Sequence, residues 1–293
     1  MGVLHAAVDA GVTFLDTADV YGDGRSEILI GRLLAERPDA ALTVATKMGR
    51  RAEPHVPEAF TLAAFREWTD RSRANLGVEM LDLVQLHCPP SLVLSDDRVF
   101  DALDTLVAEQ RIAAYGVSVE TCEEALTAIA RPHVATVQLI LNVFRRKPLE
   151  RVLPAAVAAG VGIIARVPLA SGLLSGKYDE TTTFAPQDHR TYNRHGEAFD
   201  VGETFAGVPF EVGLEAVREL AGVVSTGSTM AQFALRWIVD QPGVSVVIPG
   251  ARDPGQARAN AASAELPRLS AEQLAAVRET YDRLIRPHVH DRW

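Results

Sequence analysis

Three successive apolar runs near the start of the chain each end in a polar residue that could take part in proton transfer. The first run ends in Asp16, with Tyr21 in the segment that follows, the second ends in Lys47 and the third in His87. The carboxyl ends of parallel strands meet at one rim, so we expect these four side chains to lie together. Taken singly, each has a structural explanation, such as turn formation or packing. Their common position at strand ends favours a functional interpretation.

Together the four side chains would make a tuned proton donor. An unperturbed tyrosine has a pKa of about 10, too high for ready proton exchange at neutral pH. We expect the Lys47 ammonium to lower the pKa of Tyr21, while Asp16 keeps Lys47 oriented. His87 would hold a substrate oxygen by a hydrogen bond. This arrangement predicts a general acid that faces a carbonyl group.

The elements that must position these residues alternate between short apolar runs and amphipathic segments. The runs are apolar on both faces, which is typical of parallel strands covered by helices. Apolar residues at helical spacing lie between them, and the pairs Thr121/Glu124 and Thr229/Gln232 predict capping boxes at helix starts. The predicted strands are 12–16, 42–47, 81–87, 113–119, 134–142, 161–167 and 244–248.

The unbroken βα alternation predicts one domain over residues 1–293. Two architectures fit, a closed (β/α)8 barrel and an open doubly wound sheet. The open sheet would place a Gly-x-Gly-x-x-Gly turn after its first strand, and the nearest match, at 22–27, lacks the third glycine. We therefore predict an α/β fold, a (β/α)8 TIM-type barrel of which seven strands are recognisable in this chain.

Two segments depart from this rhythm. Residues 175–210 have no sustained period and scatter aromatic rings among charges and glycines, which is typical of a lid or binding loop. Ser270 and Gln273 predict the start of a helix, so residues 270–293 are expected to form a C-terminal helix and tail.

The chain resembles the aldo-keto reductase family. Asp-Thr-Ala-x-x-Tyr-Gly at 16–22, Ala-Thr-Lys at 45–47 and Val-Gln-Leu-His at 84–87 match that family's four catalytic residues in order and strand context. The similarity extends over nearly the whole chain. It continues through Gly-Val-Ser at 116–118, Val-Gln at 137–138, the glycine-rich run at 168–177 and Ile-Pro-Gly-Ala-Arg at 248–252.

The resemblance implies NADPH-dependent reduction of an aldehyde or ketone, reversible as oxidation of the alcohol. Tyr21 would be the general acid, Lys47 and Asp16 its tuning pair, and His87 the group that orients the carbonyl. The resemblance also implies a set of residues that bind NADP(H). Their positions in this chain are Ser118, Gln138, Arg166, Pro168, Leu169, Gly172, Leu173, Gly176, Lys177, Gly250, Arg252, Gln256 and Asn260.

Three parts of that set have a physical rationale. Glycines in the run 172–177 permit close approach, and its backbone amides would hold the pyrophosphate. The Arg252 guanidinium matches a 2′-phosphate, which favours NADP over NAD. Arg166 replaces the aromatic ring that many family members stack on the nicotinamide, and a guanidinium plane can also stack.

The resemblance implies a small-molecule carbonyl substrate as partner, and the composition argues against two other classes of partner. The 29 basic and 38 acidic residues give a formal charge of −9, so there is no excess of positive charge that would attract nucleic acid or an anionic membrane. With two cysteines and no visible targeting segment, we expect a cytoplasmic protein. His288 and His290 have no third ligand nearby in sequence, so we predict no metal site. The identity of the substrate and the oligomeric state stay open.

The start of the chain departs from the family pattern. An apolar stripe between Val3 and Val8, ended by Gly11, predicts that the chain opens in a helix. The family barrel has eight strands, and the one without a match here is the first. A barrel without it exposes two strand edges. Our hypothesis is that the chain is short at its N-terminus, and we expect it to bind NADPH weakly or to turn over slowly.

Two other function classes fit the same residues. A non-catalytic, nicotinamide-binding regulatory subunit would keep the fold and the pocket without turnover, and NADPH oxidation with carbonyl substrates separates it from a reductase. A Schiff-base lyase would use Lys47 as its nucleophile, and borohydride trapping of a substrate on Lys47 would identify it.

Overall fold

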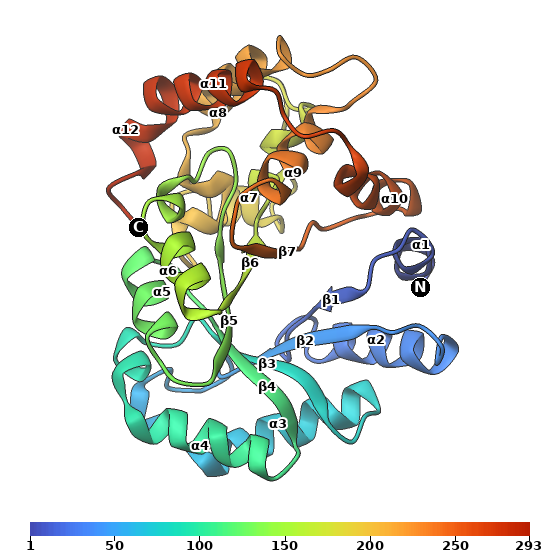
Figure 1. Ribbon diagram of the computed structural model, residues 1–293, viewed down its shortest axis with the longest axis vertical. Coiled ribbons are helices and arrows are strands. Elements are labelled where there is room, and N and C mark those ends of the chain that lie inside the picture. The colour runs from blue at the N-terminus through green and yellow to red at the C-terminus, as the bar shows by residue number, and fades with distance from the viewer.

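Seven parallel strands form one curled sheet in the computed structural model, which describes residues 1–293 (Figure 1). Each strand pairs with its neighbours in chain order. The predicted barrel is thus confirmed as a nearly closed one. The bounds of each predicted strand differ by at most two residues from those of the corresponding observed strand. The strands are β1 (Phe14–Asp16), β2 (Thr43–Met48), β3 (Leu81–His87), β4 (Ile112–Ser118), β5 (Val134–Ile140), β6 (Gly162–Arg166) and β7 (Val244–Val247).

Helices connect the strands and cover the outside of the sheet (Figure 1). The capping boxes predicted at Thr121 and Thr229 are present, and Ser270 forms a third. No helix is both long and apolar enough to cross a bilayer. The α-helices are α1 (Gly2–Asp9), α2 (Arg25–Glu36), α3 (Leu62–Leu76), α4 (Asp97–Ala108), α5 (Cys122–Ile129), α6 (Val152–Ala159), α7 (His189–Tyr192), α8 (Phe210–Ala221), α9 (Met230–Val239), α10 (Pro254–Ala262), α11 (Ala271–Thr280) and α12 (Arg286–Val289).

Shorter helical turns complete the connections. The 3₁₀ turns are η1 (Pro57–Ala59), η2 (Ser91–Ser95), η3 (Lys147–Leu149), η4 (Ala170–Ser175), η5 (Val201–Glu203), η6 (Phe205–Gly207) and η7 (Ser263–Glu265), and η8 (Tyr281–Ile285) is a π-helical turn between α11 and α12.

The sheet has two edges, as expected for a barrel with seven strands. β1 pairs only with β2, and β7 pairs only with β6. α1, the predicted opening helix, packs against α10, so the ring of helices continues across the opening between the two edge strands (Figure 1). The closure of the outer ring therefore depends on helix packing rather than on strand pairing.

Most of the apolar core lies between the sheet and the helices. A smaller cluster of Ala45, Leu83 and Ile164 fills the inside of the barrel. Phe14 on β1 and Val246 on β7 pack against this inner cluster but stay half-buried, since both lie on edge strands.

The strand register brings predicted site residues side by side. His87 on β3 is opposite Ser118 on β4, which in turn is opposite Gln138 on β5. Lys47 on β2 is opposite Gln85 on β3. Since parallel strands end at one rim, this register places their polar ends together.

The segment 175–210 consists of short turns around an aromatic cluster. Tyr178, Phe184, Phe205 and Phe210 pack with ring centroids 5.1 to 6.3 Å apart. Arg190 lies 4.3 Å above the Phe184 ring. One short helix, α7, lies within the segment, and the function of the segment as a lid stays a prediction.

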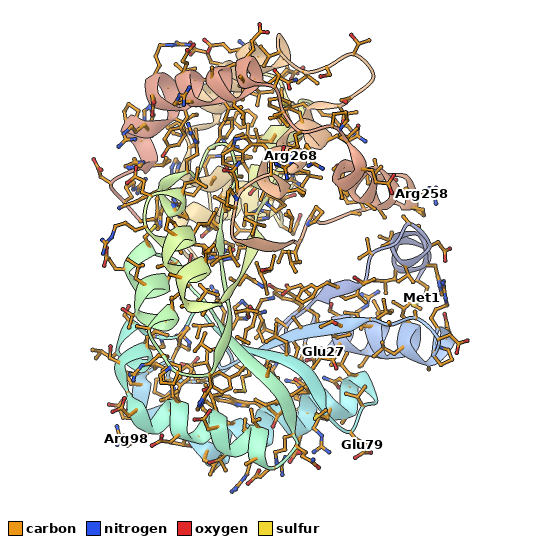
Figure 2. All side chains as sticks on the ribbon, viewed as in Figure 1. Met1, Glu27, Glu79, Arg98, Arg258 and Arg268 are labelled. Carbon is orange, nitrogen blue, oxygen red and sulfur yellow. The ribbon has the colours of Figure 1, made fainter.

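The loop that carries Tyr21 contains a buried carboxyl group, that of Asp19. Asp19 is 1% exposed, and its Oδ1 has no hydrogen-bond partner. Desolvation, aided by the nearby Glu27 carboxylate between α2 and the sheet, raises the pKa of Asp19 to about 6 (Figure 2). Glu27 is better satisfied, because it accepts hydrogen bonds from Thr46 and Asn75 at 2.6 and 2.8 Å.

We predict that the amide protons of β1 and β7 exchange with solvent faster than those of the central strands β3 and β4. Edge strands leave half of their backbone groups without a strand partner, so they open at lower free energy. Hydrogen–deuterium exchange measured by mass spectrometry or NMR tests this. Equal protection in edge and central strands would mean that β1 and β7 pair in solution.

We also predict that Asp19→Asn stabilises the fold at pH 7.5 by about 1 kcal/mol, the scale for relieving an unsatisfied buried group. Folding raises the pKa of this acid, so the folded state loses stability as pH rises from about 4 to above 6. The gain should therefore shrink at pH 5. Urea unfolding at both pH values measures it. Asp23→Asn, which removes the carboxylate paired with Arg51 and Arg71, is the control and should show no gain.

Candidate active site

A cavity of about 530 Å³ opens at the rim formed by the carboxyl ends of the strands. Asp16, Tyr21 and His87 line it, as the sequence predicts. Lys47 lies behind Asp16 and is 1% exposed. The full lining is Asp16, Val20, Tyr21, Arg50, His87, Cys88, Ser118, Gln138, Arg166, Val167, Tyr192, Phe199, Glu203 and Ile248.

A buried ion pair lies at the base of this cavity. The Lys47 Nζ lies 2.5 Å from Asp16 Oδ2 and donates a second hydrogen bond to the Thr17 carbonyl oxygen at 2.8 Å. The other carboxylate oxygen of Asp16 accepts hydrogen bonds from Gln138 at 2.8 Å and Gln85 at 3.3 Å. Both charges are thus paired and hydrogen-bonded, which is the condition for placing them out of water.

Tyr21 lies next to this ion pair. Its ring centroid is 5.2 Å from Lys47 Nζ and 5.8 Å from the His87 ring, which meets it edge to face. The sequence predicts that Lys47 lowers the pKa of Tyr21. In the structure, desolvation raises the pKa of Tyr21 above its ordinary value, Lys47 lowers it, and Asp16 raises it again. The net shift is upward because desolvation, with a smaller contribution from Asp16, outweighs the effect of Lys47.

His87 is a neutral imidazole at physiological pH. Desolvation, together with the charges of Lys47 and Arg50, holds the pKa of His87 well below its usual range. Its Nδ1 is buried and has no hydrogen-bond partner. A neutral imidazole can donate one hydrogen bond, so this residue can hold an oxygen atom without adding charge to the site.

Three of the predicted cofactor residues line the same cavity. Ser118 contacts the Cys88 thiol at 3.5 Å, and Gln138 donates to Asp16 while its Oε1 accepts no hydrogen bond. Arg166 is 7% exposed and lies between two carboxylates, 2.7 Å from Glu120 and 3.0 Å from Glu203. Burial alone would lower the pKa of Arg166, but these two carboxylates raise it above its ordinary value.

Cys88, Glu120 and Glu203 are the only three metal-ligand side chains that lie close enough together to share an ion. The Arg166 guanidinium already pairs with both carboxylates. Burial raises the pKa of Cys88 to about 12, so its thiol is protonated at neutral pH. This group is therefore better described as a buried arginine cluster than as a metal site.

The glycine-rich turn after β6 lies outside the cavity lining. Gly172 and Gly176 adopt φ values of 97° and 70°, which favour glycine. Their amides donate within the turn, to the carbonyl oxygens of Leu169 and Leu173. Pro168 and Leu173 are buried, whereas Lys177 is exposed. The role of this turn in binding pyrophosphate stays a prediction.

The predicted adenosine-side residues organise the loop between β7 and α10. The Gln256 side chain accepts a hydrogen bond from the Arg252 amide at 2.9 Å. Asn260 donates to the Gly250 carbonyl oxygen at 3.1 Å. The Arg252 side chain is exposed and makes no ion pair or hydrogen bond, so the loop presents a free guanidinium to solvent.

Several lining residues were missed by the sequence analysis. Arg50 stands three residues after Lys47 in the same strand-end loop, so its position could have identified it. Tyr192, Phe199 and Glu203 come from the segment 175–210. That segment was expected to reach the site, but its lack of a period gave no means of choosing residues within it.

Comparisons with known proteins agree with this architecture. A model of the Aldo/keto reductase family matches residues 1–282. The aldo-keto reductase YhdN of Bacillus subtilis is 32% identical over 261 residues, which cover 87% of this chain and 76% of YhdN.

Two solved structures share the fold. The glycerol dehydrogenase from Gluconobacter oxydans has a TM-score of 0.77 and 31% identity, and the match covers 98% of this chain and 85% of that chain. An aldo-keto reductase from Klebsiella pneumoniae in complex with NADPH has a TM-score of 0.69 and 25% identity, covering 95% and 83%. From the family match, the sequence identity and the shared barrel, we conclude that this chain belongs to the aldo/keto reductase family.

Proposed function

We propose that this protein reduces an aldehyde or ketone to the alcohol with NADPH, reversibly, and that Tyr21 supplies the proton. The observation that carries the proposal is the common location of the Tyr21 phenol, the Lys47–Asp16 ion pair and the neutral His87 at one cavity. When bound, the reduced nicotinamide supplies the hydride, and the residues of the chain handle the proton and the carbonyl oxygen.

The proton step follows from the electrostatics of the site. Desolvation raises the pKa of Tyr21, so the phenol is protonated at neutral pH, and the neighbouring Lys47 ammonium acts in the opposite direction by favouring loss of that proton. His87 would donate a hydrogen bond to the carbonyl oxygen and so direct it toward the phenol. As negative charge develops on that oxygen, the Tyr21 hydroxyl donates its proton, and the nearby Lys47 ammonium stabilises the phenolate that remains.

The chain's own donor set supports an NADP(H) site. The Ser118 hydroxyl can donate to the C=O group of a carboxamide, and the free Gln138 Oε1 can accept from its N–H group. The unpaired Arg252 guanidinium suits a phosphate monoester. The Klebsiella relative, solved in complex with NADPH, is consistent with this assignment.

The contacts of Lys47 argue against the Schiff-base alternative. An imine requires a neutral amine with a free lone pair. Lys47 Nζ instead donates to the Asp16 carboxylate and the Thr17 carbonyl oxygen, both of which favour the ammonium form. All four predicted catalytic side chains are present, so nothing in the site favours a non-catalytic regulatory subunit over an enzyme.

We further propose that the segment 175–210 forms the substrate side of the cavity. Tyr192 and Phe199 supply aromatic surface, while Glu203 and Arg50 supply charged hydrogen-bonding groups. Such a wall suits a small carbonyl compound that carries both polar and apolar groups.

We predict that Tyr21→Phe lowers kcat for reduction of glyceraldehyde by roughly 10²- to 10⁴-fold, the usual contribution of a positioned general acid. The change removes one hydroxyl and leaves the ring beside His87. Steady-state NADPH oxidation measures the rate, and fluorescence titration should give an unchanged Kd for NADPH. A variant that keeps wild-type kcat would remove Tyr21 from the proposed mechanism.

We predict that Arg252→Met weakens NADPH binding by about tenfold or more and leaves NADH binding unchanged, because a charge-assisted contact to the 2′-phosphate is lost. Fluorescence titration with each nucleotide measures both constants. Arg258→Met is the matched control. Arg258 lies on α10, and like Arg252 it is exposed and makes no ion pair (Figure 2). Equal loss with NADPH and NADH would contradict a role in reading the 2′-phosphate.

A further inference from the structure

Residues 199–207, which we call the wall, include Phe199 and Glu203 of the cavity lining. Contacts of Glu203 and Phe205 attach the wall to the rest of the barrel. The Glu203 carboxylate pairs with Arg166 at 3.0 Å. Its backbone carbonyl accepts a hydrogen bond from the Ser171 hydroxyl at 3.0 Å, and the Phe205 amide donates to the same hydroxyl at 3.1 Å. The wall is therefore attached both to the end of β6 and to the glycine-rich turn that follows it.

Trp293 also contacts the wall and helps to hold it in place. The indole Nε1 donates to both carboxylate oxygens of Asp200, at 3.0 and 3.2 Å. Asp200 also accepts a hydrogen bond from the Gly202 amide at 2.7 Å. The indole ring packs so closely on the backbone that a Cβ at Gly202 or Gly207 would lie 3.1 or 2.4 Å from it. Trp293 thus contacts the residues on both sides of Glu203.

Arg145 packs against the Trp293 indole. Its guanidinium lies 3.4 Å from the centre of the Trp293 ring, a stacked cation–π contact. The side chain is 3% exposed, and its Nη2 has no hydrogen-bond partner. Burial lowers the pKa of Arg145 to about 9, so it remains charged at neutral pH, with Asp200 favouring that charge. A buried cation of this kind gains stability from the indole face and loses it when the ring is removed.

We propose that Trp293 is a positioning residue for the active site: it holds Asp200 and Gly202 so that the Glu203 carboxylate stays on Arg166 and the substrate side of the cavity keeps its shape. This inference rests on the proposed reductase function. Trp293 does not line the cavity, so any effect on the reaction must pass through the lining residues of the segment that it holds, and Glu203 is the one that is paired with Arg166.

We predict that Trp293→Leu raises KM for glyceraldehyde about tenfold, equivalent to about 1.4 kcal/mol, with a smaller change in kcat. Trp293→Phe, which keeps the stack on Arg145 but lacks the N–H donor, should recover part of the loss. Asp200→Asn, which keeps an acceptor for the indole, should lie between Trp293→Phe and the wild type. Steady-state kinetics at saturating NADPH measures all three.

A double-mutant cycle tests the route through Glu203. If Trp293 acts by placing that carboxylate, Trp293→Leu adds little to KM once Glu203→Gln is present, because the contact that it supports is already weakened. The matched control is Tyr281→Phe, which removes a buried hydrogen bond to His290, also near the end of the chain, without touching the wall. This control should lower stability and leave KM unchanged.

Hydrogen exchange over residues 199–207 separates this inference from the proposed function. Faster exchange there in Trp293→Leu, but not in Tyr281→Phe, supports the positioning role even if no carbonyl substrate is turned over. Unchanged exchange overturns the role, as does unchanged KM or an additive double-mutant cycle. If Trp293→Leu does not fold, Trp293→Phe and Asp200→Asn carry the same measurements.

Discussion

The buried ion pair between Lys47 and Asp16 is the interaction on which the site depends. An ammonium that is 1% exposed is tolerated only because a carboxylate and a carbonyl oxygen replace its water. Asp16 is held in turn by Gln85 and Gln138, so strands β1, β2, β3 and β5 all contribute to one charge pair. Breaking such a pair from one side costs about 3–5 kcal/mol, and for this reason the register of these strands is also a condition for the chemistry.

A second buried ionic group contributes Arg166 and Glu203 to the lining of the same cavity. Arg166 joins Glu120, from the loop after β4, to Glu203, from the irregular segment after β6. The first ion pair lies beside the phenol, whereas the second attaches the segment that carries Glu203 to the end of β6.

The fold and the four strand-end residues could be predicted because each depends on local sequence. Apolar runs define the strands, and a polar residue at the end of such a run must lie at the rim. The sign of the Tyr21 pKa shift could not be predicted, since it depends on desolvation and on how closely Asp16 neutralises Lys47. Glu203 and Trp293 could not be found either, because their contacts join residues that are far apart in the chain, 93 residues for Asp200 and Trp293, and no sequence pattern links them.

Transfer of a labelled hydrogen from NADPH to a carbonyl substrate tests the proposed reductase activity. The protein is mixed with NADPH that carries deuterium at the transferable position of the nicotinamide, together with an aldehyde, and the alcohol is analysed by mass spectrometry. The account predicts an alcohol with one deuterium on the former carbonyl carbon, and its loss when Lys47 is replaced by Met. Bound NADPH with no labelled alcohol, over a panel of small aldehydes and ketones, would contradict the reductase and favour a protein that binds the nucleotide without turnover.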